Sequence, residues 1–277
     1  MNPQPIKGKL PILISLLTIV LALMWLVGRC SRSNENSIVQ QYHRPGGDTL
    51  SIAIELAPTS YAFNGDSATG FDYEMIKDIS KIHNIPIKFQ PFAPLDYALS
   101  GLRKGDFDVV IANIPASSEL HKEFNLTDEI FVDRQVLVRL KDTMSDSIGE
   151  QPAQIKLLGD TVWISASSPF RNRLQNLSQE LGDTIYILSD PEYNSEHLVL
   201  LTALGEIKQA VVNESVAKRL SADYPELDVS TPISMSQFQP WIVGESKQSL
   251  RDSLNSWIKQ YKETPEYQAL LRKYIEI

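Results

Sequence analysis

The residue types most often used for catalysis and metal binding are few in this chain and far apart. None of the histidines has another histidine, a cysteine or a carboxylate at the spacing of a metal-ligand motif; they are His43, His83, His121 and His197. The single cysteine, Cys30, follows a long apolar run, so it is no buried nucleophile and no intrachain disulfide can form. The GxSxG, GxGxxG and P-loop patterns are missing from the sequence. The sequence therefore predicts no catalytic residue, no metal site and no cofactor.

The charge of the chain argues against one class of partner. The formal net charge is -8, and Lys and Arg form no stripe along the sequence. Nucleic-acid-binding proteins need a basic surface to neutralise phosphates. We therefore expect no nucleic-acid partner.

The N-terminal residues predict a membrane segment. Lys7 and Lys9 precede the uncharged apolar run 10–28, which would span roughly 28 Å as a helix, close to a bilayer core. We expect residues 1–9 to be a cytoplasmic tail, 10–28 a transmembrane signal anchor and 29–48 a polar tether. Two alternatives remain open: a lipoprotein modified on Cys30, which the preceding Arg29 disfavours, and a cleaved secretory peptide.

After the tether, apolar periodicity changes repeatedly between the strand and the helix pattern. The segment "TLSIAIEL" alternates like a strand, and "GFDYEMIKDISKI" places its apolar residues on one helical face. A second helix ends at Gly105 and leads into a buried-looking strand over 107–112. This order predicts a mostly parallel sheet covered by helices.

The middle of the chain repeats this design. The segments "DTVWISA", "TIYIL" and "QAVVNE" are typical of strands, and helical patterns separate them. Two helices follow, and the second should begin with Thr264 as its N-cap and Pro265 in its first turn. The fold class is therefore α/β, with two lobes of similar design.

The order of the longer segments gives a resemblance to a known family. The segments are "GFDYEMIKDI" at 70–79, "GDFDVVIANIPASSELHKEFNLTDEIF" at 105–131, "AVVNESVAKRL" at 210–220 and "YPELDV" at 224–229. Together they resemble family 3 of the solute-binding proteins, the periplasmic amino-acid receptors of ABC importers, over most of residues 50–277. Within that group the resemblance is closest to the non-catalytic N-terminal domain of the membrane-bound lytic transglycosylase F family.

The resemblance implies a periplasmic-binding-protein-like fold of type II. Two lobes with mixed, mostly parallel sheets would close on a ligand about a two-strand hinge. We expect lobe 1 to contain 49–139 plus 236–277, and lobe 2 to contain 140–235. The first hinge strand would be "DRQVLVRL" at 133–140, and the second would lie near 232–241.

The family's ligand contacts are carried over onto matching positions of this sequence. Tyr61 or Phe63 would bring an aromatic ring to the ligand, and Asn113 and Ser117 follow the strand that supplies polar groups. In lobe 2, Ser167 and Ser168 open a helix, which is a natural anion site. The resemblance also implies that Glu214 would take the ligand amine.

One position departs from the family pattern. The arginine that usually grips the ligand carboxylate falls on Leu120. Either Arg171 replaces that arginine from the lobe 2 helix, or the ligand is not a free α-amino acid. A peptide-like, muropeptide-like or sugar-derived ligand would fit the second reading, and a cleft that binds a protein partner is a third.

The sequence predicts a binding module rather than an enzyme. We expect a single-pass protein of the bacterial inner membrane, with its main domain in the periplasm, that closes on a small ligand for sensing or transport. Its candidate partners are an ABC permease or cell-wall enzymes. The alternative is a cell-wall-associated protein that resembles a lytic transglycosylase without its catalytic domain and acts as a regulatory or scaffold module. We expect no catalytic domain, because the sequence leaves no room for one after Ile277.

Overall fold

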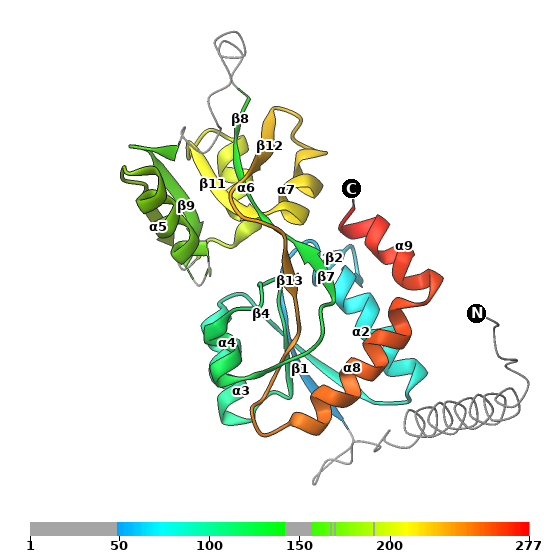
Figure 1. Ribbon diagram of the computed structural model, residues 1–277. Helices are drawn as coiled ribbons and strands as arrows, with labels where there is room; N and C mark the ends of the chain where they lie inside the picture. Colours follow the sequence, from blue (N-terminus) through cyan, green and yellow to red (C-terminus); the bar gives the residue numbers. More distant parts are fainter. Residues whose placement is uncertain (1–48, 142–156, 167, 169, 191, 277) are drawn as a thin grey trace, which may run out of the picture. The chain divides into compact units, whose positions relative to one another are not determined.

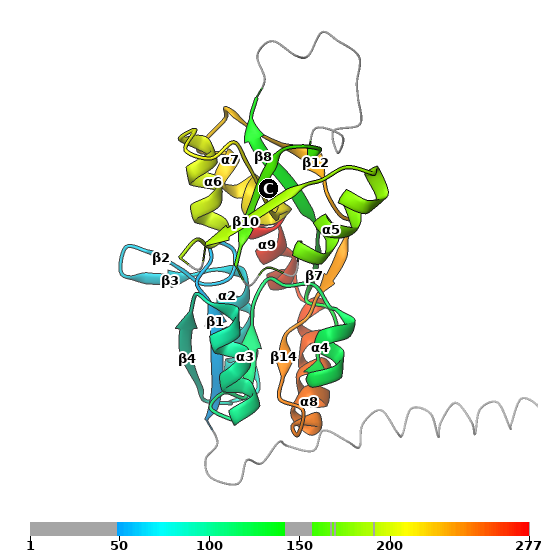
Figure 2. The same ribbon diagram turned by 90° about the vertical axis from the view of Figure 1, so that its left-hand side faces the viewer.

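The computed structural model of the protein describes residues 49–141, 157–166, 168, 170–190 and 192–276. Two five-stranded mixed sheets form two lobes, and a pair of short strands runs between them (Figures 1 and 2). The two-lobe α/β fold predicted from the sequence is confirmed. The predicted tail 1–9, span 10–28 and tether 29–48 all lie outside the described residues. Within the part of the chain that is described, no helix is both long and apolar enough to cross a membrane.

The first lobe is built on the sheet order β4-β1-β5-β14-β6. Strands β4, β1 and β5 are parallel, whereas β14 is antiparallel to β5 and β6. The strands are β1 (Leu50–Glu55), β4 (Ile87–Phe92), β5 (Val109–Ile111), β6 (Asn125–Leu126) and β14 (Ile242–Val243). The hairpin β2 (Ala62–Asn64) and β3 (Ser67–Thr69) extends from this lobe (Figure 2).

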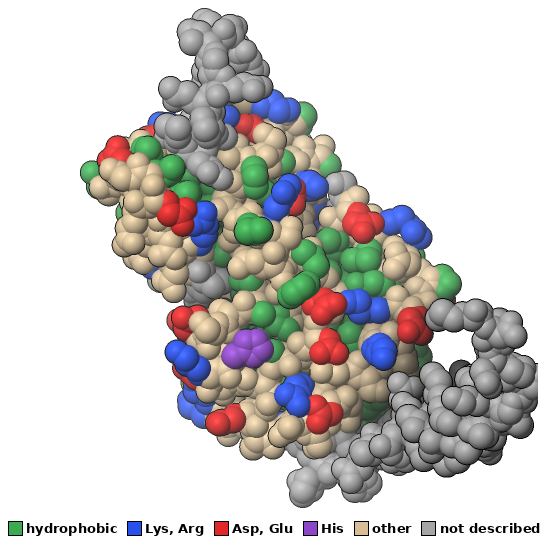
Figure 3. All heavy atoms as spheres, viewed as in Figure 1, with side chains coloured by type: hydrophobic (Ala, Val, Ile, Leu, Met, Phe, Trp, Pro, Cys, Tyr) green, Lys and Arg blue, Asp and Glu red, His purple; other side chains and the backbone are tan. Residues whose placement is uncertain are grey.

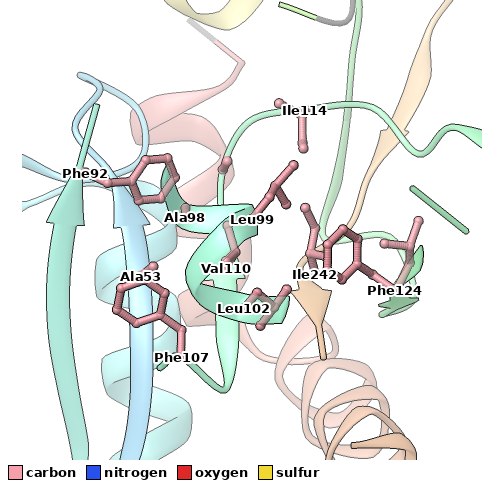
Figure 4. Packing of buried hydrophobic residues seen from close by; sticks show 12 residues of the cluster. Ala53, Phe92, Ala98, Leu99, Leu102, Phe107, Val110, Ile114, Phe124 and Ile242 are labelled. Carbon is pink, nitrogen blue, oxygen red and sulfur yellow. The ribbon is translucent and has the colours of Figure 1, made fainter. Parts of the chain in front are cut away.

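Helices cover both faces of the first sheet. They are α2 (Phe71–Ile82), α3 (Leu95–Lys104), α4 (Ser118–Glu123), α8 (Gln248–Lys262) and α9 (Pro265–Tyr274). Figure 1 shows α3 and α4 on one side of the sheet and α2 and α8 on the other. In Figure 4, Leu99 and Leu102 of α3 pack with Val110 of the sheet. The predicted N-cap of α9 is confirmed, since the Thr264 hydroxyl accepts a hydrogen bond from the Tyr267 N–H at 3.3 Å.

The second lobe repeats the pattern with the order β10-β9-β11-β8-β12. Strands β10, β9 and β11 are parallel, and β8 is antiparallel to its two neighbours. The elements are β8 (Gln135–Leu140), β9 (Thr161–Ser165), α5 (Phe170–Leu181), β10 (Tyr186–Asp190), α6 (Ser195–Ala203), β11 (Gln209–Asn213), α7 (Glu214–Ser221) and β12 (Leu227–Pro232). Alternate residues of β11 face opposite ways, so Val211 packs under α5, whereas Ala210 and Val212 pack under α6 and α7.

The strands between the lobes are shorter than the sequence predicts. β7 (Phe131–Asp133) pairs antiparallel with β13 (Gln237–Gln239), which lies inside the predicted second hinge region. β8, predicted as hinge strand and assigned to lobe 1 up to residue 139, instead lies between β11 and β12 in the second sheet. Its alternating buried residues Val136, Leu137 and Val138 serve both faces of that sheet, which explains this difference.

Candidate functional site

A cleft lies where parallel strands of both sheets end. Its volume is about 270 Å³. The first lobe contributes Glu55, Leu56, Ala57, residues 93–96, Asn113 and Ile114, and the second contributes Ser165, Ala166, Ser168, Phe170, residues 192–197, Asn213 and Val216. Glu55 ends β1, and Asn213 ends β11. In open α/β sheets ligands bind outside the carboxyl ends of strands, where the strand order reverses, and both sheets offer such a point here.

A hydrogen-bond network joins the lobes beside this cleft. The Asn113 side-chain amide donates to Asp133 Oδ2 and to Ser215 Oγ, both at 3.1 Å. The Ser215 hydroxyl donates to the same Asp133 oxygen at 2.6 Å. The Asn213 side chain donates to the backbone oxygen of Asn113 at 2.7 Å. Side chains of both sheets therefore meet at β7, one of the strands between the lobes.

The two asparagines of this network each keep an unpaired acceptor among the described residues. Asn113 and Asn213 are only 6% and 4% exposed, yet the side-chain oxygen of each lacks a hydrogen-bond partner among the described residues. Such buried acceptors are uncommon, because leaving one unpaired costs about 1–3 kcal/mol. Both residues line the cleft, so these buried acceptors lie in its wall.

Glu55 carries the most perturbed carboxyl group of the cleft. Burial, with a smaller contribution from the negative charge of Asp72, raises its pKa to about 7, although the hydrogen bond from the Asn113 N–H, at 3.0 Å, lowers it. Asp72 is itself buried at the start of α2, where burial raises its pKa to about 6 despite a hydrogen bond from Trp241. Burial also raises the pKa of Asp133. The acidic groups behind the cleft are therefore protonated more readily than exposed ones.

The predicted ligand contacts are divided between the cleft and other places. Asn113 and Ser168 line the cleft. Tyr61 is buried among the rings of Phe63, Tyr73 and Phe89, whereas Phe63 is 63% exposed. Ser167 lies outside the described residues. As ligand contacts, all of these residues stay predictions.

The remaining predicted contacts are hydrogen-bonded elsewhere. Ser117 caps α4, accepting the Leu120 N–H at 3.2 Å. The Arg171 guanidinium donates to Ser189 Oγ at 2.8 Å. Glu214 receives two hydrogen bonds from Arg134, each 2.8 Å long. Partial burial of Glu214 opposes its ionisation, but these bonds and Lys218 hold its pKa below the ordinary value. None of these three predicted contacts is among the described residues that line the cleft.

Sequence reasoning missed the acidic residues of the cleft. Glu55, Asp96, Glu192 and Glu196 all line it. A usable signal existed for Glu55 and for Asn213, because each ends a strand of the predicted parallel sheets, where ligands bind. Asp96, in the first turn of α3, and Glu196, in that of α6, gave no such signal, because acidic residues are common there for helix stability alone.

Metal-binding groups and patches of a single charge sign would indicate other kinds of site. No group of three or more His, Cys, Asp or Glu side chains in the described residues could hold a metal ion. On the face drawn in Figure 3, acidic and basic side chains are interspersed rather than gathered by sign. The geometry is that of a small cleft between two lobes.

Comparisons with known proteins agree with this fold. The relatives include membrane-bound lytic murein transglycosylase F of Shewanella sediminis (strain HAW-EB3), 23% identical over 76% of this chain and 42% of the relative. The same enzyme of Idiomarina loihiensis (strain ATCC BAA-735 / DSM 15497 / L2-TR) is 22% identical over 90% of this chain and 52% of the relative. The chain thus spans about half the length of these relatives or less. Among solved structures, an ancestral arginine-binding protein bound to arginine superposes with a TM-score of 0.70 at 20% identity, covering 83% of this chain and 99% of that one.

A family model decides the assignment. The model of the bacterial extracellular solute-binding proteins, family 3, matches residues 49–277, which contain both lobes. This match agrees with the strand order of the two sheets and with the cleft at their carboxyl ends. The chain belongs to the bacterial extracellular solute-binding proteins, family 3.

Proposed function

We propose that the protein is a non-catalytic solute-binding module that closes on a small ligand outside the cytoplasm. The observation that carries this proposal is the cleft, whose lining comes from the strand ends of both sheets. The two lobes are connected by the short strands β7 and β13. A change of backbone angles in these strands would widen or narrow the opening between the lobes. A volume of about 270 Å³ lies just below the usual lower limit of roughly 300 Å³ for ligand pockets, which favours a small solute.

We also propose a place for the module in the cell. The apolar run 10–28 would hold the protein in the bacterial inner membrane, with the two lobes in the periplasm. The family name, which describes extracellular solute-binding proteins, is consistent with this location. Its partners would then be a permease, if the module delivers solutes, or a membrane-bound receptor, if it senses them.

A thermal-shift screen of the full chain in detergent tests the binding function. Amino acids, peptides, muropeptides and organic amines are each added at about one hundred times the dissociation constant expected of a receptor. Binding to the folded state alone adds about 2.7 kcal/mol at that ratio, and we expect the matching class to raise the Tm by roughly 5–10 °C. If no class raises the Tm, the protein is not a solute-binding module.

A second candidate function is a regulatory module for cell-wall enzymes. It is favoured by the relatives, which are named lytic murein transglycosylases and match this chain over about half of their length or less. In that case the ligand would be a muropeptide, or the surface around the cleft would contact an enzyme. Recovery of a cell-wall hydrolase, rather than a permease, after cross-linking in intact cells would favour this second function.

A further inference from the structure

The described lining of the cleft contains four carboxylates and no lysine or arginine. Glu55 and Asp96 come from the first lobe, and Glu192 and Glu196 come from the second. Asp96 and Glu192 are exposed at the rim, while Glu55 and Glu196 are half-buried. A ligand carboxylate in this cleft would meet charges of its own sign from both sides.

The arginines that could offset this charge are hydrogen-bonded away from the cleft. Arg171, the predicted replacement for the missing family arginine, donates to Ser189, and Arg134 forms a two-pronged ion pair with Glu214. Leu120 is half-buried and packs against the core cluster of the first lobe. Among the described residues, therefore, neither the family position nor its predicted substitute provides a cation in the cleft.

The two buried asparagines of the cleft wall, Asn113 and Asn213, add no donor for an anion. Both side chains are more than nine-tenths buried, and each uses its NH2 group within the network between the lobes. Their side-chain oxygens are buried as well and have no donor among the described residues. Neither asparagine therefore offers an N–H group to a ligand carboxylate.

The feature of the cleft that favours an anion is weak. Helix α5 begins there, but the Ser168 hydroxyl already accepts the Phe170 N–H at 3.2 Å. A helix N-terminus strengthens anion binding by about twofold to fivefold, whereas an arginine fork contributes roughly tenfold to 150-fold. The N-termini of α3 and α6 already have Asp96 and Glu196 in their first turns. A ligand carboxylate thus has little to hold it.

The distribution of the carboxylates also links charge to closure. Each lobe contributes two of these carboxyl groups, so movement of the lobes towards each other brings them closer. The resulting repulsion grows with the fraction of them that is ionised, which the raised pKa of Glu55 reduces for that residue. A cation between the lobes reverses the sign of this interaction. The rings of Phe170 and Tyr193, which line the same cleft, can cover an apolar body and the face of a cation.

We propose that the cleft binds an organic cation that carries no carboxylate, such as a primary amine or a guanidine on a short aliphatic chain. This inference rests on the proposed solute-binding function and specifies its ligand class. The ammonium or guanidinium group would be held by the carboxylates of both lobes, and the chain would lie against the rings.

Matched ligand pairs test the inference by calorimetric titration of the full chain in detergent. Agmatine is compared with arginine, and cadaverine with lysine, since the members of each pair differ only in the carboxylate. We expect each amine to bind at least tenfold more tightly than its amino acid. Equal or tighter binding of the amino acids would overturn the inference and leave the solute-binding function intact. If none of the four binds but another class of compound in the screen does, the inference is likewise overturned and the solute-binding function stands. If no compound binds at all, both proposals fail.

Charge-neutral substitutions locate the cation. Glu196→Gln should weaken agmatine binding roughly threefold to tenfold, as expected for a half-exposed ion pair. The matched control is Glu206→Gln, which removes the same charge from an exposed position after α6, outside the cleft lining, and should leave the affinity unchanged. The Tm of both variants without ligand shows whether each is folded. Equal affinities in the two folded variants would place the cation elsewhere and overturn the inference.

Discussion

At the scale of single residues, Glu55 makes the stability of the protein depend on pH. Burial raises its folded-state pKa from 4.5 to about 7, with Asp72 adding to the shift. The other titratable side chains that line the same cleft are Asp96, Glu192, Glu196 and His197. The folded state keeps a proton that the unfolded state releases. The stabilising contribution is therefore complete below about pH 4.5 and is lost as the pH rises to about 7.

The variant Glu55→Gln isolates this effect. A glutamine oxygen can still accept the Asn113 N–H, but it does not titrate. We expect the Tm of the variant to rise relative to the wild type between pH 5 and pH 7.5, measured by differential scanning fluorimetry. A difference that stays constant over this range would show that Glu55 titrates normally. Asp72, with a folded-state pKa of about 6, titrates in both proteins, so the comparison removes its own contribution but not its repulsion with Glu55, which the variant lacks.

The sequence predicts some residues of the cleft and not others, for physical reasons. Asn113 and Ser168 line the cleft because each stands near the carboxyl end of a parallel strand. Tyr61 is predicted as a ligand contact because it is an aromatic residue in the loop after the first strand, but its ring is buried in an aromatic cluster with Tyr73. Glu214 directly follows such a strand, yet its carboxylate is held by Arg134, across a sequence separation that no local pattern reveals.

At the scale of elements, Ser215 joins α7 to the strand between the lobes, because both its hydroxyl and its backbone N–H donate to Asp133. Ser215 is 2% exposed and donates to Asp133 while accepting from Asn113. Ser215→Ala should lower the free energy of unfolding by about 1–3 kcal/mol, because Asp133 stays buried with one donor fewer. Urea unfolding followed by tryptophan fluorescence measures the loss. The control Ser221→Ala, at the far end of α7, should change the free energy by less than about 0.5 kcal/mol; equal losses would contradict this role of the network.

The loop before α2 requires glycine at one position. Gly70 has φ +136°, and a Cβ there would lie 2.2 Å from the backbone oxygen of Ser60. Gly70→Ala should therefore cost more than about 2 kcal/mol in the free energy of unfolding, from backbone strain and from displacement of this loop. Gly65, at φ +60° with nothing within 4 Å, is the matched control, and Gly65→Ala should cost only about 1 kcal/mol. Similar costs for the two variants in chemical unfolding would be incompatible with this geometry.

The longer elements could be predicted from the sequence, and the short ones could not. Helices α2, α3 and α5 and strands β1, β9 and β11 each show a clear apolar period. β7 and β13 have three residues each, which is too few to show an apolar period. Their pairing joins residues far apart in the sequence, such as Phe131 and Gln239, so no local pattern predicts it. Because these short strands set the boundary between the lobes, the sequence alone predicts β8 in lobe 1, whereas it belongs to the second sheet.

At the scale of the whole molecule, the proposed N-terminal anchor makes a prediction about where the protein is found. We predict that Cys30→Ser leaves the protein in the membrane fraction, since the uncharged run 10–28 is long enough to span a bilayer without lipid on the cysteine. Deletion of residues 1–47 should instead give a soluble, folded protein, because the family match begins at residue 49. Fractionation followed by circular dichroism checks both outcomes. Release of the Cys30→Ser variant into the soluble periplasm would contradict the anchor and favour a lipoprotein.

The central claim is that the cleft holds the solute, and a blocked cleft tests it most directly. Ala93 is exposed and lines the cleft, so Ala93→Trp would fill part of its volume without disturbing the core. Ala222, exposed at the end of α7 and outside the lining, provides the control Ala222→Trp. The measurement is the dissociation constant of the tightest compound from the screen, by calorimetry on the full chain. The account predicts that Ala93→Trp weakens binding at least tenfold and that Ala222→Trp leaves it unchanged. Equal affinity in the wild type and both variants would contradict it.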